Sequence, residues 1–209
     1  YASNQLYVTK TLDENGAEHY EFTDKLGQVV LKRQVLDNGT LVSTYYVYDD
    51  FGLLRFVISP EGSRLITGNF DASSVLAKKC VYCYTYDSRK RLIEKQVPGK
   101  DVEYYVYNKN DKVVMYQDGN LRSGAKWMFT KYDALGRVIM TGTTTERGTL
   151  SRASVQSAAD GFTTCWEFVI GGSSYPAIDD MYYANNAFPS YNNSSYTLLT
   201  LNYYDTYWV

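Results

Sequence analysis

The chain has 209 residues, enough to bury one substantial core, with 21 basic and 23 acidic residues and a formal net charge of −2. No block of like charges supplies the basic face that nucleic-acid binding requires, and no apolar run approaches the roughly 20 residues of a membrane helix. Tyrosine occurs 22 times, against 4 prolines and 1 histidine. This usage favours β-sheet, so we expect a single all-β domain over residues 1–209. The chain starts at Tyr1 rather than at methionine, which we interpret as a piece of a larger polypeptide.

A ten-residue frame recurs along the chain. The copies are "FTDKLGQVVL" (22–31), "VYDDFGLLRF" (47–56), "TYDSRKRLIE" (85–94), "VYNKNDKVVM" (106–115) and "KYDALGRVIM" (131–140). Their anchor residues are Asp24, Asp49, Asp87, Asn108 and Asp133, spaced by 25, 38, 21 and 25 residues. A period near 25 with one insertion indicates a repeat architecture. The string "YYDTYWV" (203–209) has the form of a further copy cut short.

Each copy of the frame predicts a β-hairpin. Residues that favour strands precede and follow the anchor, so four residues must reverse the chain. Asp at the first turn position accepts a hydrogen bond from an amide two residues on, and Gly at the fourth supplies the positive φ that closes the turn into a bulge. Gly27, Gly52 and Gly136 meet this demand. Lys90 and Asp111 replace the glycine in the other copies, where we expect a longer or less regular turn.

A second set of turn signals alternates with the frames. It comprises "DENG" (13–16), "DNG" (37–39), "PEG" (60–62), "PG" (98–99) and "DG" (118–119). Up to residue 61 the chain reverses every 11 to 13 residues. This spacing predicts an antiparallel meander that buries one face against whatever covers the sheet.

Two segments depart from the frame. In the insertion between 63 and 79, "FDASSVLAKK" predicts a short helical turn capped by Asp71. Beyond Gly148, "TLSRASVQSAAD" predicts one short helix near 151–159 that begins at Thr149 or Ser151 and ends at Gly161.

The end of the chain follows this helix. We expect a strand over 164–170, a turn at "GGSS", an irregular packed loop over 175–195 and a closing strand over 196–204. The repeats would then occupy about residues 1–145, and an atypical helix, loop and strand segment residues 146–209.

The frame Y-x-Y-D-x-x-G-R-apolar resembles the YD repeats of RHS-repeat proteins and teneurins. The strings "YTYDSRKRLIEKQVPG", "YYVYNKNDKVVMYQDGNLR" and "WMFTKYDALGRVIMTG" are similar to RHS-type cell-surface proteins of Bacteroidetes. The resemblance covers most of residues 20–145 and touches the end again at "LNYYDTYW". It implies a β-sheet that spirals into a hollow shell, and five frames would form a curved open sheet, an arc of such a shell.

The resemblance also implies a location and partners. In related proteins the shell encloses a toxic C-terminal domain, as in polymorphic toxins, or remains an extracellular scaffold. We therefore expect a secreted or cell-surface protein whose partners are the adjacent repeats of the same polypeptide and an enclosed C-terminal domain. The aspartyl self-cleavage signature that ends many RHS toxin cores is missing, because the sequence contains no Asp-Pro dipeptide.

The repeated residues have a structural and a catalytic interpretation. The anchor aspartates could serve as a glycosidase pair, but a residue used at one turn position in several copies needs no catalytic explanation. Arg55, Arg91 and Arg137 are expected to cover tyrosine rings or to pair with acids across strands. The residues to which we assign a structural role are Asp24, Gly27, Tyr48, Asp49, Gly52, Tyr86, Asp87, Arg91, Tyr107, Asn108, Tyr132, Asp133, Gly136 and Arg137.

Other chemistry has little support in the sequence. His19 has no Cys or His partner at metal-ligand spacing, and Cys165 would need a histidine base to act as a nucleophile. Cys80 and Cys83, three apart on a predicted strand, point to opposite faces. The sequence contains no P-loop, G-x-G-x-x-G or G-x-S-x-G motif. We expect no catalytic residue, no metal and no cofactor.

The frame therefore predicts a structural module rather than an enzyme. The module would form part of the β-sheet wall of a larger protein. The alternative is a carbohydrate- or protein-binding surface that uses exposed tyrosine and tryptophan rings. Trp127, Trp166 and Tyr175 are the first candidates for it. Packing competes with binding as the use of these rings, since tyrosine is amphipathic and suits a half-buried sheet face.

Overall fold

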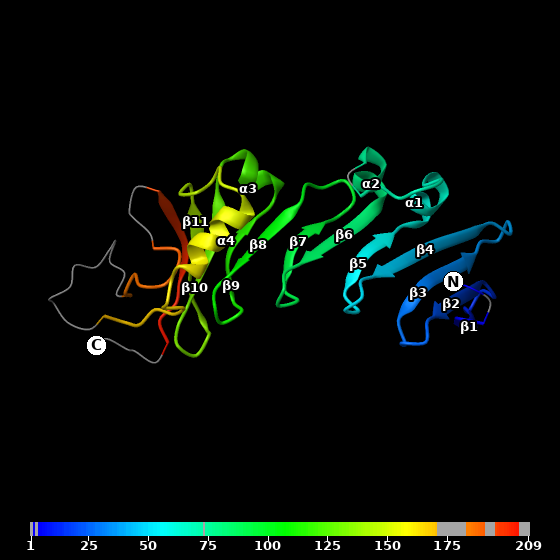
Figure 1. Cartoon of the computed structure of the whole chain (residues 1–209), viewed down its shortest axis with the longest axis horizontal. Helices are drawn as coiled ribbons and strands as arrows, with labels where there is room; N and C mark the ends of the chain where they lie inside the picture. Colours follow the sequence, from blue (N-terminus) through cyan, green and yellow to red (C-terminus); the bar gives the residue numbers. More distant parts are fainter. Residues whose placement is uncertain (1, 3, 73, 171–182, 191–194, 205–209) are drawn as a thin grey trace. The chain divides into compact units, whose positions relative to one another are not determined.

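The computed structural model describes residues 2, 4–72, 74–170, 183–190 and 195–204. The chain divides into two compact units, Tyr1–Val102 and Glu103–Val209. In each unit the strands lie side by side in chain order, and each strand is antiparallel to the next (Figure 1). The predicted fold class, an all-β antiparallel meander of hairpins, is confirmed. The single domain stays a prediction.

The first unit is a sheet with two short helices inserted after its fifth strand. Its strands are β1 (Tyr7–Leu12), β2 (Glu18–Thr23), β3 (Val29–Val35), β4 (Leu41–Tyr48), β5 (Leu54–Ile58), β6 (Val81–Tyr86) and β7 (Leu92–Gln96). The helices are α1 (Pro60–Leu65) and α2 (Val75–Cys80). Helix α1 packs against β4 and β5 and α2 against β6, where Ala77, Cys80 and Val81 are buried.

The second unit contains the larger core. Its elements are β8 (Glu103–Tyr107), β9 (Val113–Gln117), α3 (Gly119–Ser123), β10 (Trp127–Tyr132), β11 (Val138–Thr144), α4 (Arg152–Asp160) and β12 (Tyr196–Leu201). Val155 and Ala159 of α4 pack in one cluster with Val106, Met115 and Phe129 of the sheet. The predicted helix near 151–159 is thus α4, and Ser151 caps it by accepting a hydrogen bond from the Ser154 amide.

All five frame turns, which lie wholly within the described residues, have one geometry. At Asp133, Oδ1 accepts hydrogen bonds from the amides of Leu135 (3.0 Å) and Arg137 (2.8 Å). The Asp133 carbonyl also accepts from the Gly136 amide at 3.0 Å. The same bonds recur at the other four anchors.

The two copies without glycine are as regular as the others, so the expectation of longer or irregular turns at Lys90 and Asp111 was wrong. Lys90 has φ 63° and Asp111 has φ 60°, close to the 77° of Gly136. A left-handed residue with a Cβ costs about 1–2 kcal/mol. The turn hydrogen bonds and the strand pairing on both sides outweigh that cost, because they fix the backbone conformation whatever residue stands there.

Three of the other predicted features differ from the structure. "PEG" and "DG" do not form simple turns but begin α1 and α3, with Ser59 and Asp118 as N-caps. Helix α2 is capped by Ser74 rather than by Asp71. The cause is shared chemistry, because Ser and Asp bond exposed amides equally well at a turn and at a helix start.

The prediction of a strand over 164–170 was also wrong. Among the described residues, this stretch makes one isolated β-bridge, between Val169 and Tyr183. The closing strand forms as β12. The "GGSS" turn (171–174) and most of the predicted loop over 175–195 lie outside the described residues.

Gly136 should tolerate a side chain less well than its neighbour Ala134. A Cβ at Gly136 would adopt a left-handed conformation and would meet Lys112 Cε at 3.1 Å. We expect Gly136→Val to lower the free energy of unfolding by about 2 kcal/mol and Ala134→Val by less than about 0.5 kcal/mol. Urea unfolding of both variants measures the difference, and equal losses would contradict the turn geometry.

Candidate functional site

At several copies of the frame, the tyrosine that precedes the anchor links its hairpin to the one before it. Tyr48 Oη donates a hydrogen bond to the carbonyl of Val29 at 3.1 Å. Tyr86 donates in the same way to Leu54 (3.0 Å) and Tyr132 to Val113 (2.8 Å). In each case the acceptor lies five residues after the preceding anchor. In the YD pair, the aspartate thus stabilises its own turn, and the tyrosine donates a hydrogen bond to the previous hairpin.

A β-bulge explains why this carbonyl needs a partner. Tyr48 pairs with Leu54 and Val47 with Phe56, so Arg55 is an extra residue on β5. The ladder to the next strand begins only at Phe56, which pairs with Cys83. The Leu54 carbonyl therefore lies beyond the ladder, and the Tyr86 hydroxyl supplies the hydrogen bond that it would otherwise lack. Each of the frames has a register shift at the corresponding position.

The last described residues repeat the same link. Tyr204 Oη donates to the carbonyl of Val138 at 3.1 Å, five residues after Asp133. Met140 pairs with Leu201 in the register in which Met115 pairs with Phe129. A sixth frame thus begins at β12, although its predicted anchor, Asp205, lies outside the described residues.

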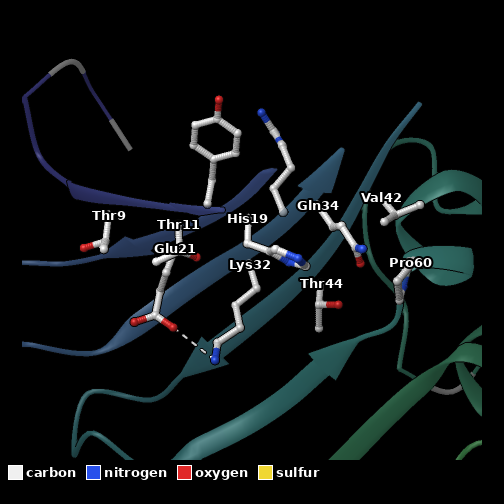
Figure 2. Close-up of a pocket in the computed structure, with 11 residues that line it drawn as sticks. Thr9, Thr11, His19, Glu21, Lys32, Gln34, Val42, Thr44 and Pro60 are labelled. Atoms are coloured by element: carbon white, nitrogen blue, oxygen red, sulfur yellow. Dashed lines mark ion pairs between the residues drawn. The ribbon is translucent and has the colours of Figure 1, made fainter. Parts of the chain in front are cut away.

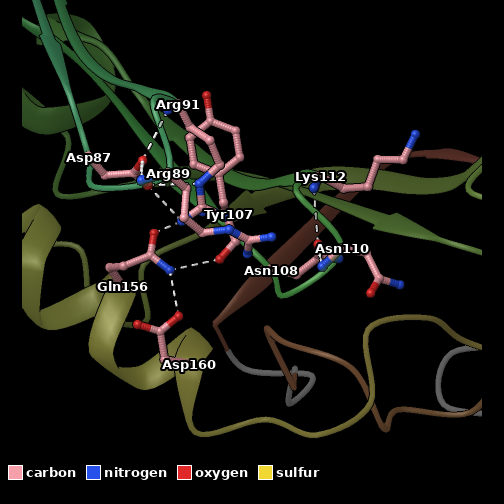
Figure 3. Close-up of polar contacts among 9 residues, drawn as sticks. All are labelled: Asp87, Arg89, Arg91, Tyr107, Asn108, Asn110, Lys112, Gln156 and Asp160. Carbon is pink, nitrogen blue, oxygen red and sulfur yellow. Dashed lines mark hydrogen bonds and ion pairs between the residues drawn. The ribbon is translucent and has the colours of Figure 1, made fainter. Parts of the chain in front are cut away.

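Two of the frame arginines, Arg91 and Arg137, pair with the anchor of their own turn. Arg137 Nε donates to Asp133 Oδ2 at 2.6 Å, and its guanidinium lies 4.4 Å from the centre of the Tyr204 ring. Arg91 Nε donates to Asp87 Oδ2 at 2.7 Å (Figure 3). Covering of a tyrosine ring is therefore confirmed for Arg137, and the ion pairs with Asp87 and Asp133 lie within the turns. Arg55 Nε is buried and makes no hydrogen bond within the described residues.

These contacts set the charge state of the anchors. Burial acts to raise the pKa of the Asp133 carboxyl, but the hydrogen bonds and charge of Arg137 and the turn amides hold the pKa below its ordinary value of 3.8. The pKa of Asp87 is lowered against the same opposition from burial, by Arg91. Asn108 has no charge, yet its Oδ1 accepts the same two amides, those of Asn110 and Lys112, at 3.0 Å each (Figure 3). The turn requires the oxygen, and the negative charge adds only the arginine pair.

Helix α4 is fixed to the sheet by a backbone-like contact. Gln156 Oε1 accepts from the Tyr107 amide at 3.0 Å, and its Nε2 donates to the Tyr107 carbonyl at 2.8 Å (Figure 3). One amide side chain therefore bonds both backbone groups of the residue before the Asn108 anchor.

A buried ion pair connects the fifth frame to the atypical segment. Lys131 Nζ donates to Glu167 Oε1 (2.6 Å), Asn185 Oδ1 (3.0 Å) and the Ala187 carbonyl (3.0 Å). Glu167 also accepts from the amides of Asn186 and Ala187. Neither charged side chain is exposed. Burial lowers the pKa of Lys131, and the Glu167 carboxylate opposes that shift.

The position of Lys131 departs from the other copies of the frame. Two residues before the anchor, they carry Phe22, Val47, Thr85 and Val106. A lysine among such residues is the signal by which the sequence could have revealed this contact. Its partner, 36 residues away in a segment without periodicity, could not have been found from spacing.

The proposed ring-binding residues lie in different environments. Trp127 is fully buried in the core, where Nε1 donates to the Arg147 carbonyl, so it offers no exposed ring to a ligand. Trp166 is partly exposed and makes an edge contact with Phe168 at 6.1 Å. Tyr175 lies outside the described residues. The three candidates are therefore not shown to form one site.

A polar recess of about 470 Å³ lies on the sheet of the first unit (Figure 2). Its floor consists of two rows of cross-strand neighbours on β1–β4, with Val42 and Pro60 at one end. Glu21 and Lys32 form an ion pair at 3.0 Å within it. The rows are Thr9, Glu21, Lys32, Thr44 and Thr11, His19, Gln34, Val42. No sequence pattern pointed to this recess, because alternating polar residues are equally typical of a solvated sheet face.

Metal and thiol chemistry find little support in the part of the chain that the structure describes. Within it, no three His, Cys, Asp or Glu side chains lie close enough to hold a metal ion. His19 Nε2 lies 3.4 Å from Asp13 Oδ2, and Cys80, Cys83 and Cys165 are free thiols. Among the described helices, none has the length and apolar character to cross a bilayer.

The fold and the linked turns define a class: an all-β protein of tandem hairpin repeats. No family model and no curated protein matches the chain. Similar solved structures include a Tc holotoxin pore of Photorhabdus luminescens with a mutation in TccC3 (13% identity, TM-score 0.43) and a crystal structure of TcdB2-TccC3-TEV (13%, 0.44). The matches cover 64% and 62% of this chain but only 6% of each of those chains. The RHS family stays a prediction based on the repeated frame.

The negative charge of Asp133 should stabilise the fold only at pH values above the lowered pKa of its carboxyl group, where that group is ionised. We expect Asp133→Asn to keep the turn, as Asn108 does, and to lose about 0.5–1 kcal/mol through the lost Arg137 pair. Because the folded-state pKa is lowered, this contribution is present above the ordinary value of 3.8 and disappears as the pH falls through the lowered pKa. Urea unfolding at neutral and acidic pH tests this, with Asp50→Asn as the control. A deficit that does not change with pH would contradict it.

Loss of Lys131 should destabilise the second unit strongly. Lys131→Met leaves the Glu167 carboxylate buried without its cation, which costs about 3–5 kcal/mol. Adding Glu167→Gln should restore part of the loss, because the neutral amide oxygen still accepts from the Asn186 and Ala187 amides. Thermal unfolding of the single and double variants measures this. A double variant less stable than Lys131→Met would show that the ion pair is not the source of the loss.

Proposed function

We propose that the chain is a structural module, a stretch of wall in a larger β-structure built from YD hairpins. The observation that carries this proposal is a bond from a frame tyrosine to a carbonyl of the preceding hairpin, seen for Tyr48, Tyr86, Tyr132 and Tyr204. Within each unit, a bond that recurs between consecutive hairpins helps to hold them in one sheet. The motif thereby has an architectural use at these four copies.

The use of the anchor carboxylates supports the same proposal. The Oδ1 atom of each anchor accepts hydrogen bonds from two turn amides. The second carboxylate oxygen of Asp87 and of Asp133 accepts a hydrogen bond from an arginine. Carboxylates held in this way are poor candidates for a catalytic pair, which must face one another across a substrate. A role other than that of an enzyme is thus part of the proposal.

The finer assignment rests on the sequence resemblance. It places the wall in a large secreted or cell-surface bacterial protein of the RHS type, where it adjoins further repeats and encloses a toxin or effector domain. Both outer strands suit such a place, since β1 is exposed along its whole length and β12 over most of it.

Hydrogen exchange can test whether the sheet continues. In the isolated chain, we expect the backbone amides of β1 that point away from β2 to exchange within the fastest class, because an edge strand leaves them to water. In the intact parent protein, a neighbouring strand should protect them by at least about tenfold. The matched control is β3, which has a partner on both sides and should be protected in both samples. Equally fast exchange of β1 in both would contradict the proposal.

A second candidate function is glycan binding at the polar recess of Figure 2. Glu21 and Lys32 pair with each other, and the neighbouring threonine hydroxyls and the Gln34 amide suit the hydroxyls of a sugar. A glycan array probed with the wild type and with Gln34→Leu tests this candidate. Hits that the variant loses would support it, and an array without hits would remove it.

A further inference from the structure

An apolar row crosses one face of the sheet in the first unit. Cross-strand pairing places Phe22 beside Leu31, Leu31 beside Tyr45, and Tyr45 beside Ile58. Residues paired directly across antiparallel strands share a face. The row extends to Val8 at one end and to Val81 at the other.

Only one end of this row is covered. Ile58 and Val81 pack in one cluster with α2 and with Ile66 and Phe70, which precede it, and Val81 has no exposed surface. Beyond the helices, Tyr45 is 37% exposed and Val8 is 55% exposed. The apolar face therefore continues past the helices that bury its beginning.

The equivalent positions in the second unit are buried. Val106, Met115 and Phe129 occupy the frame positions of Phe22, Leu31 and Tyr45, and their exposure is at most 1%. Their cover includes Val155 and Ala159 of α4. The repeat thus shows what fits this row: a helix that presents small apolar residues four positions apart.

A groove marks the uncovered part of the row. It has a volume of about 570 Å³ and lies between the turns of the first two frames and β3 and β4. Leu31, Tyr45 and Val47 line it, and Val47 is 40% exposed. At the rim stands the exposed side chain of Asp50. An apolar floor with an acidic rim complements a helix that is apolar on one side and carries a basic residue beside that face.

We propose that this groove is the docking site of an amphipathic helix from a partner polypeptide. The helix would extend the α1–α2 layer across β3 and β4, with small apolar residues against Leu31, Tyr45 and Val47 and a lysine or arginine near Asp50. This interaction goes beyond the role as wall and does not depend on it.

The sequence of α4 supplies the probe. A peptide of residues 149–162, "TLSRASVQSAADGF", has Arg152 one turn before Val155, with Ala159 one turn after it. Titrated into the ¹⁵N-labelled chain, it should shift the backbone signals of residues lining the groove, with a Kd of about 1 mM or lower. A peptide of the same composition in scrambled order should shift them at least about tenfold less at equal concentration.

Two variants make the test specific. Val47→Asp places a charge on the groove floor and should raise the Kd by about tenfold or more, while the fold remains because Val47 is already half exposed. Val75→Asp is the matched control: it alters an exposed valine of α2 outside the groove and should leave the Kd unchanged. Circular dichroism melts verify that both variants are folded.

Three outcomes would overturn the proposal. The first is an absence of shifts at the groove with the α4 peptide, and the second is equal shifts with the scrambled peptide. The third is self-association of the wild type that Val47→Asp abolishes in sedimentation experiments, because the groove would then be an interface between copies of this chain.

Discussion

The β-bulge after each frame turn is the constraint on which the repeat depends. It shifts the strand register by one residue and leaves one carbonyl beyond the reach of the next ladder. An unpaired backbone carbonyl costs about 1–3 kcal/mol when it is removed from water. The next hairpin supplies the missing donor through the tyrosine that precedes its anchor, as Tyr132 does for Val113. The YD dipeptide thereby couples a local event, the turn, to a long-range one, the attachment of one hairpin to another.

The sequence was most informative where one residue determines one local geometry. The anchors predicted the turns and strand pairing, and Ser151 was one of two residues predicted to start α4. It was least informative where the same residue types serve two structures, as at Ser59 and Asp118, which start helices instead of turns. Lys90 shows a third case, since register and hydrogen bonding imposed a left-handed conformation on a residue that does not favour it. Periodicity found the repeats but could not find contacts outside them, such as the partner of Lys131.

The segment over 146–195 is best understood as an insertion between two frames. The chain leaves the sheet after β11 and returns at β12 in the register of an ordinary repeat, with Tyr204 bonded to Val138. Between these fixed ends the described parts of the segment must take one path over the core. An apolar contact at residue 131 would hold many paths about equally well, whereas a buried ammonium group accepts only the one that brings three oxygens to it. Lys131 and Glu167 therefore select the path by making alternatives costly.

The core of a repeat protein depends on two things, the repeated frame and the segments between its copies. The frame gives every copy the same apolar positions, because the turn and the bulge fix which side chains share a face. Whether those positions become core depends on what the intervening segments place over them. In the second unit α4 and the segment after it bury Val106 and Phe129, and in the first unit the cluster around α2 includes Phe56, Ile58 and Val81 but not Leu31 or Tyr45. Tyr45 has the sheet position of a core residue and the exposure of a surface residue, because the insertions, unlike the repeats, are not uniform along the chain.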